Sequence, residues 1–122
     1  MTKPLNTTVD FIVDATYTSY GEYGKIIIGN NGFEFYSNKK AKNFVQIPWR
    51  EIDQVIASVY IGGRWIPRFA IRTKSNGTFT FTSKKPKKLL QAIHVYIPSK
   101  KMVRSLTFMQ VLKRKIKSMC NS

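Results

Sequence analysis

The feature that most constrains this fold is a succession of short β-branched and aromatic stretches, separated by turn signals, over residues 10–83. Such residues favour pleated sheets, and the glycine and asparagine between them favour tight turns. The clearest case is GKIIIGNNGFEFYS at residues 24–37, where GNNG separates two apolar stretches and predicts a β-hairpin. Residues 10–20, 43–49 and 51–61 are also typical of strands, so we expect a sheet of about six strands.

A second hairpin is predicted around SNG at residues 75–77. A three-residue loop pairs Ile71 with Phe81 and Thr73 with Phe79. This register collects the apolar side chains on one face and places the glycine at the left-handed position of the loop. The opposite face of the first strand then points to solvent. It carries Arg68, Arg72 and Lys74.

A helix is predicted after the strands. The segment Ser83–Pro86 is typical of a helix N-terminus, because proline fits the first turn, and Pro98 ends the helix. A run of strands followed by helix is an α+β order. The expected fold is a pleckstrin-homology-like antiparallel β-roll or barrel capped by this C-terminal helix. The apolar residues that recur at helical spacing and should pack on the sheet are Leu89, Leu90, Ile93, Tyr96 and Ile97.

A second, basic amphipathic helix is predicted from about Ser105 onward, with Phe108, Leu112 and Ile116 on its apolar face. Such a helix is typical of a membrane interface or a partner groove, and the alternative is that it packs on the domain as a second core helix. We expect one domain over residues 1–122, with the roll at 1–98 and a helical extension at 99–122. The basic face of the extension carries Lys113, Arg114 and Lys117.

The distribution of charge indicates the kind of partner. The chain carries 21 Lys and Arg against 6 Asp and Glu, a formal net charge of +15. All six acids and six of the bases lie in residues 1–53, whereas residues 54–122 hold fifteen bases and no acid. Such segregation favours an anionic partner: nucleic acid, phospholipid headgroups or an acidic protein face. The alternative is a basic protein whose charge serves solubility alone.

The stretch IGGRWIPRFAI at residues 61–71 is typical neither of a plain strand nor of a helix. Its two glycines can form a tight turn, and the proline limits strand pairing, which indicates a sheet edge or a bulge. Trp65 between Arg64 and Arg68 has the composition of an interface anchor. The alternative is that Trp65 fills the open end of the barrel.

Catalytic and cofactor motifs are absent from the sequence, and we expect no enzyme, cofactor or metal. The single histidine, His94, lies within the helix pattern, and the single cysteine, Cys120, can form neither an internal disulfide nor a metal site. Glu51 and Asp53 are more typical of salt bridges than of acid–base chemistry. Because no apolar run approaches about 20 residues and no secretory pattern is present, the sequence predicts a cytoplasmic protein.

Nucleic-acid binding is the alternative function. Basic residues interleaved with aromatics can stack bases. The register predicted above, however, turns Phe69, Phe79 and Phe81 toward the core. The chain also has no RNP-like motif and no helix-turn-helix signature, so only affinity for phosphate without sequence preference is expected from the charge.

Three segments resemble the ManO-like proteins, a small domain-of-unknown-function family of Gram-positive bacteria. Members are typically encoded beside genes of mannose-family phosphotransferase transporters. The segments are VDATYTSYGEYGKIIIGNNGFEFYS, VQIPWREIDQVIASVYIGGRWIPRFAIRTKSNGTFTFTS and KMVRSLTF. More loosely, QIPWREIDQVIASV resembles a strand-turn-strand of bacterial pleckstrin-homology-like domains, which supports the roll.

The resemblance implies an accessory or regulatory protein of sugar uptake, in a family without established catalytic residues. The expected partner is the membrane-embedded permease of the mannose-family phosphotransferase system. It would be bound at the inner face of the cell membrane, where an anionic lipid surface adds attraction. The alternative is a nucleic-acid-binding regulator of the sugar-uptake operon. The residues expected to bind the partner are Arg64, Trp65, Arg68, Arg72, Lys113, Arg114 and Lys117.

Overall fold

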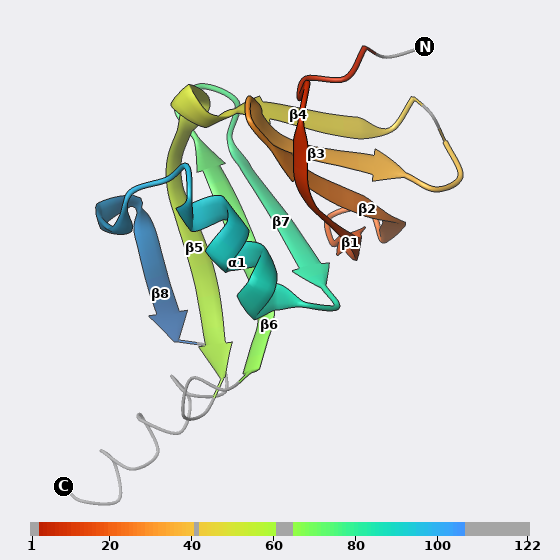
Figure 1. Ribbon diagram of the computed structural model, residues 1–122. Helices are drawn as coiled ribbons and strands as arrows, with labels where there is room; N and C mark the ends of the chain where they lie inside the picture. The colour runs from red at the N-terminus through yellow and green to blue at the C-terminus, as the bar shows by residue number, and fades with distance from the viewer. Residues whose placement is uncertain (1–2, 41, 61–64, 107–122) are drawn as a thin grey trace, which may run out of the picture.

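The computed structural model describes residues 3–40, 42–60 and 65–106. In this part of the chain, eight strands form one mixed sheet in the order β4-β3-β2-β1-β7-β6-β5-β8, accompanied by the helix α1 (Figure 1). The strands are β1 (Val9–Tyr17), β2 (Glu22–Gly29), β3 (Gly32–Ser37), β4 (Phe44–Pro48), β5 (Ile52–Tyr60), β6 (Trp65–Thr73), β7 (Thr78–Ser83) and β8 (Met102–Leu106). The helices are α1 (Pro86–His94) and the short 3₁₀ turns η1 (Trp49–Glu51) and η3 (Ser99–Lys101).

The sheet has two halves that share only a short pairing. Strands β1 to β4 form an antiparallel meander, and β5, β6 and β7 form a second one. The halves meet where Ala15–Tyr17 of β1 pairs with Phe81–Ser83 of β7, and Figure 1 shows them running in different directions on either side of this join. The predicted α+β class, with many strands and one packed helix, is confirmed.

Phe81 lies at the centre of the core. Its ring centroid is 5.1 Å from that of Phe33, 5.2 Å from Tyr17, 5.5 Å from Phe35 and 5.7 Å from Phe69. These phenylalanines come from both halves of the sheet and are at most 1% exposed. Because burying a side chain of this kind contributes about 1.5–3 kcal/mol, the cluster stabilises the join that the short β1–β7 pairing begins.

The register predicted for the second hairpin is wrong by two residues. The structure pairs Ile71 with Phe79 and Arg72 with Thr78, so the chain turns over a longer connection than SNG alone. A hydroxyl explains the difference, because Thr73 Oγ1 donates to the carbonyl of Gly77 at 2.7 Å and also accepts the N–H of Asn76. A shift of two residues leaves every side chain on its predicted face. The predicted left-handed glycine is confirmed, with φ of 80°.

Helix α1 confirms the predicted helix, although it ends at His94 rather than at Pro98. Pro86 occupies its first turn, as proline favours. Leu89 and Ile93 are fully buried, and Ile97, just beyond the helix, is 2% exposed. The helix packs against β1, β2, β6 and β7, so it covers the core that the two halves of the sheet leave open.

Strand β8 corrects the expectation of a purely antiparallel sheet followed by helix. It pairs in parallel with β5, from Val55↔Met102 to Val59↔Leu106. For residues 102–106, the predicted helical extension is therefore a strand of the main sheet. The alternation of Met102 toward the core and Val103 on the outer side matches that of Val55 and Ile56. The remainder of the predicted second helix, at 107–122, lies outside the described residues.

The N-terminal segment crosses the outer side of β3 and β4. Gln46 of β4 donates its side-chain amide to the carbonyl of Lys3 at 2.8 Å, and Asn31 donates to the carbonyl of Leu5 at 3.0 Å. Asn6 accepts the main-chain N–H groups of Asn31 and Gly32. These polar contacts fasten a segment that contributes no strand of its own.

Candidate partner-binding site

Two of the predicted partner-binding residues are brought together on one surface. Arg68 and Arg72 lie on β6, four residues apart, with exposed side chains that point away from the core. Trp65 begins β6 opposite Tyr60. The other predicted residues lie outside the described part of the chain: Arg64, Lys113, Arg114 and Lys117.

The surface around these arginines mixes small side chains with larger ones, since Gln54 is opposite Arg72 and Ile56 is opposite Ala70. We call it the basic face: the outer side of β5, β6 and β7. Ser58 of β5 is opposite Arg68, and Ala70 between the two arginines is opposite Thr80 of β7. Both guanidinium groups are exposed on this face, so a partner can reach them. Arginine suits such contacts, since its planar fork binds carboxylates and phosphates with two hydrogen bonds.

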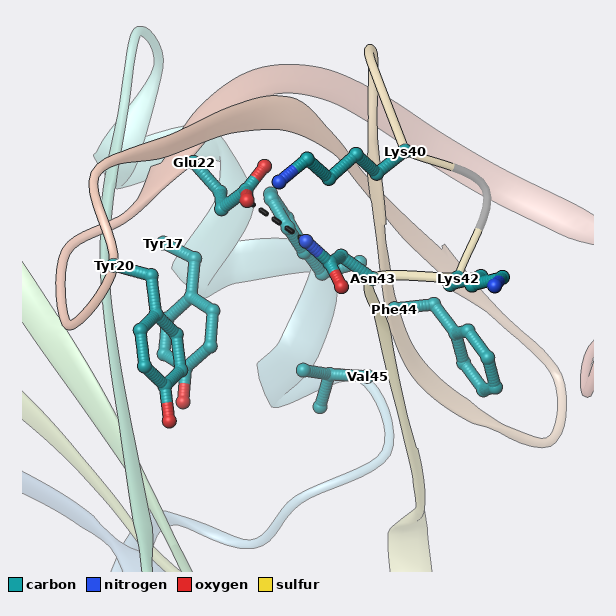
Figure 2. A pocket seen from close by; sticks show the side chains of 9 residues that line it. Tyr17, Tyr20, Glu22, Lys40, Lys42, Asn43, Phe44 and Val45 are labelled. Carbon is teal, nitrogen blue, oxygen red and sulfur yellow. Dashed lines mark hydrogen bonds between the residues drawn. The ribbon is translucent and has the colours of Figure 1, made fainter.

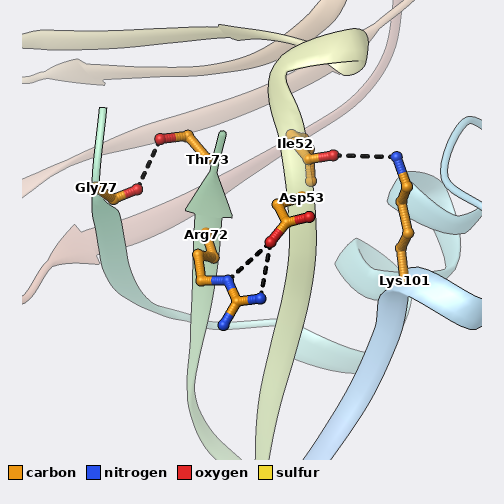
Figure 3. Close-up of polar contacts among 6 residues, drawn as sticks. All are labelled: Ile52, Asp53, Arg72, Thr73, Gly77 and Lys101. Atoms are coloured by element: carbon orange, nitrogen blue, oxygen red, sulfur yellow. Dashed lines mark hydrogen bonds and ion pairs between the residues drawn. The ribbon is translucent and has the colours of Figure 1, made fainter. Parts of the chain in front are cut away.

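Arg72 already has an acidic neighbour. Its Nε and Nη2 donate to Asp53 Oδ2 at 2.9 and 2.7 Å (Figure 3). Both side chains are more than 40% exposed, so the ion pair contributes at most about 1 kcal/mol and can be exchanged for an external anion. The expectation that Asp53 forms a salt bridge is confirmed. Among the described residues, no acid lies within 4 Å of the Arg68 guanidinium, which is therefore the freer cation of the pair.

Four lysines at the start of α1 form a second positive cluster, on the helix that packs against the core side of the sheet. Lys84, Lys85, Lys87 and Lys88 are exposed and follow directly after β7. The first turn of α1 contains no acid, so these lysines face the positive end of the helix dipole, an arrangement that costs the fold some stability. From the sequence, this segment was expected only to start a helix. The run KKPKK, with five residues and four charges, was the signal that could have identified a positive cluster there.

The other singled-out groups have ordinary structural surroundings. His94 is exposed at the end of α1, and its Nδ1 lies 2.9 Å from the carbonyl oxygen of Ile97. Glu51 accepts the N–H of Lys74 through its main-chain carbonyl. Lys101 donates to the carbonyl of Ile52 (Figure 3). Over residues 3–40, 42–60 and 65–106, no group of three or more His, Cys, Asp or Glu is placed to hold a metal ion.

In the described part of the chain, α1 and the short turns are neither long nor apolar enough to cross a membrane.

A family of unknown function matches most of the chain. The family model described as "Domain of unknown function (DUF956)" matches residues 1–116. None of the curated proteins compared with the chain matches it.

Several solved structures share the fold at low sequence identity. The C-terminal domain of an unknown protein from Leishmania infantum superposes with a TM-score of 0.64 and 17% identity, covering 73% of this chain and 83% of that one. The Spt16D Pob3N heterodimer superposes with a TM-score of 0.61 and 14% identity, covering 82% of this chain and 55% of that one. The FERM and C-terminal domain complex of Drosophila Merlin superposes with a TM-score of 0.57 and 16% identity, covering 75% of this chain and 30% of that one. These neighbours include pleckstrin-homology-like and FERM-type folds, and at this identity they show the fold alone.

Proposed function

The chain belongs to the DUF956 family, and we propose that it is a non-enzymatic accessory protein that docks through its basic face. The partner we propose is the membrane-embedded permease of a mannose-family phosphotransferase system, bound at the cytoplasmic face so as to modulate sugar uptake. The resemblance to ManO-like proteins supplies the partner, and the chemistry of the face supports it. In this proposal the roll is the pleckstrin-homology-like module, and the basic extension beyond it reinforces docking.

The observation that carries the proposal is the exposed guanidinium of Arg68 on the outer face of the sheet. It lies opposite Ser58, has no acid in reach among the described residues, and is available to a carboxylate or phosphate of a partner. Residues 54–122 hold fifteen bases and no acid, and this asymmetry favours an anionic partner. Near an anionic membrane, each such charge contributes about 1 kcal/mol of attraction.

The same geometry disfavours the nucleic-acid alternative. Phe69 and Phe81 are buried, and Phe79 packs against the core, so these three rings are not presented on the open surface beside Arg68. Binding of bases by stacking requires rings on the open surface. What the basic face offers to nucleic acid is phosphate contact without sequence preference.

The proposal is tested by capture of the permease from detergent-solubilised membranes at about 0.15 M salt, where weak surface attraction is partly screened. We compare wild type with Arg68→Glu, which reverses the freest charge on the face, and with Lys39→Glu as a control. Lys39 is an exposed lysine on the β3–β4 connection, so both variants have the same net charge. We expect Arg68→Glu to weaken capture at least about tenfold, since it both removes an attraction and adds a repulsion.

If Arg68→Glu and Lys39→Glu weaken capture of the permease equally, then the net charge of the chain, and not the basic face, attracts the permease. No capture by the wild-type chain, together with a sequence-dependent shift of operon DNA at the same salt, would replace the proposal by the nucleic-acid alternative. Circular dichroism of each variant establishes that the fold is retained.

A further inference from the structure

A cleft of about 570 Å³ opens in the other half of the sheet, between the β1–β2 turn and the β3–β4 connection (Figure 2). This volume falls within the range of about 300–1,000 Å³ that is usual for small-molecule sites. The cleft has an aromatic wall on one side, a wall that includes Val45 on the other side, and a polar end. None of its side chains belongs to the basic face.

The aromatic wall consists of Tyr17 and Tyr20. Their ring centroids are 5.3 Å apart in an edge-on arrangement, and Figure 2 shows the two rings side by side along one side of the cleft. Tyr20 is 78% exposed, whereas the ring of Phe44 stacks on Tyr36 and turns away from the tyrosines (Figure 2). Large aromatic surfaces left open to water around a concavity are typical of a binding site. They suit a flat, partly apolar ring.

The polar end is built around a fixed carboxylate. Glu22 accepts one hydrogen bond from Ser37 Oγ and one from Asn43 Nδ2, each at 2.8 Å. The bond from Ser37, supported by Asn43 and by the nearby charges of Lys40 and Lys39, lowers the pKa of Glu22, so it is ionised at neutral pH. Each carboxylate oxygen retains a free lone pair, because a carboxylate accepts about four hydrogen bonds in total.

A cation lies beside this carboxylate without forming an ion pair with it. Figure 2 shows the ammonium group of Lys40 directed toward Glu22 and Asn43 at the same end of the cleft. No Lys40 nitrogen is within 4 Å of a described acid, so the charge of Lys40 remains available. The polar end therefore offers acceptors, an amide and a cation within one small space.

From this arrangement we infer that the cleft binds a phosphorylated sugar. The apolar face of the sugar ring lies on the tyrosine wall, its hydroxyls donate to Glu22 and contact Asn43, and its phosphate accepts from Lys40. A fatty acid offers Glu22 no hydrogen-bond donor, and a neutral sugar leaves Lys40 unused. A ligand that carries both donor hydroxyls and an anionic group uses both the carboxylate and the ammonium of the polar end. The inference goes beyond the proposed docking function and does not depend on it.

The test is calorimetric titration of the full chain, without the permease, with glucose 6-phosphate and mannose 6-phosphate. Glucose and inorganic phosphate are the matched half-ligands. We expect saturable binding of at least one sugar phosphate and much weaker binding of both half-ligands. Because a hydrogen bond to a charged group contributes about 1.5–3 kcal/mol, Lys40→Gln should weaken sugar-phosphate binding about tenfold or more and leave any glucose binding unchanged.

Variants with matched controls separate the cleft from general charge. Tyr20→Ala should weaken binding, whereas Tyr23→Ala should not, since Tyr23 is 70% exposed on β2 but does not line the cleft. Lys39→Gln is the charge-matched control for Lys40→Gln, because Lys39 does not line the cleft and its charge acts on Glu22 less than that of Lys40.

Three outcomes overturn the inference: no saturation by either sugar phosphate at millimolar concentration, equal effects of Lys39→Gln and Lys40→Gln, or binding of adenosine monophosphate in the absence of sugar-phosphate binding. Melting temperatures measured for each variant distinguish loss of the site from loss of the fold.

Discussion

The carboxylate of Glu34 accepts two hydrogen bonds from Asn6, one from the main-chain N–H at 3.1 Å and one from the side-chain amide at 2.8 Å. The N–H of Leu5 and the hydroxyl of Tyr36 donate to the same carboxylate. Glu34 is 1% exposed, and no cation among the described residues pairs with it. Its charge is therefore stabilised by neutral donors, most of them from a segment that lies outside the sheet.

Replacing Glu34 by Gln should release the N-terminal segment. The amide presents an NH₂ group to donors that need an acceptor, so we expect a loss of about 2–3 kcal/mol in the free energy of unfolding, measured by urea denaturation. Hydrogen exchange at Leu5 and Asn6 should accelerate more than exchange in β6. Uniform acceleration across the chain would show that Glu34 supports the whole fold rather than this segment.

The pH dependence of stability should report on the same carboxylate. Burial raises the pKa of Glu34, but the hydrogen bonds from Tyr36, Leu5 and Asn6 outweigh it and lower the pKa below its ordinary value. A carboxyl whose pKa is lowered in the folded state contributes stability at pH values above its ordinary pKa. That contribution is lost as the pH falls through the pKa of the folded state. The wild type should therefore lose stability in acid, and Glu34→Gln should lose less. Asp14→Asn, at an exposed ion pair with Lys25, should keep the wild-type profile more closely.

Tyr36 should give the complementary effect at high pH. Burial and the hydrogen bond to Glu34 raise the pKa of this phenol to about 12. A raised pKa of an acid means that the neutral phenol stabilises the fold at pH values below its ordinary pKa, and that this contribution disappears as the pH rises through about 12. Spectrophotometric titration should show one tyrosine ionising late, and Tyr36→Phe should remove that step. If the late step persists in Tyr36→Phe, another tyrosine is responsible.

Most strands could be predicted from sequence because their signals are local. The GNNG turn, the position of Pro48 at a strand end and the apolar stripe of α1 each depend on neighbouring residues, and each is found in the structure. Arg68 and Arg72 on the outer face also follow from alternation alone. A register error of two residues at the β6–β7 hairpin left this surface unchanged, since faces repeat every two residues.

The features that could not be predicted depend on distant contacts. Glu34 alternates with phenylalanines like any solvent-facing residue, and its burial follows from Asn6, which is 28 residues away in sequence. Strand β8 is short, and its pairing with β5 joins Val55 to Met102 across two strands and a helix. The cleft likewise combines the β1–β2 turn with the β3–β4 connection. Local periodicity contains no information about such pairings.

Trp49 stacks on Tyr96, which lies just after the end of α1. The two rings are 4.9 Å apart and nearly parallel, at 8°. Trp49 Nε1 donates to the carbonyl of Gly29, and the Tyr96 hydroxyl donates to Asp10. The pair therefore links the residues just after α1 to both the β4–β5 connection and β1.

A double-mutant cycle of Trp49→Leu and Tyr96→Leu should give a coupling of about 0.5–1.5 kcal/mol in the free energy of unfolding, since aromatic pairs contribute that much beyond their buried area. A starting protein with Tyr96→Phe keeps the ring and lacks only the hydroxyl, so the same cycle of ring removals measured in that background should give most of the same coupling. If Tyr96→Phe abolishes the coupling, the bond to Asp10, and not the stacking, positions the end of α1.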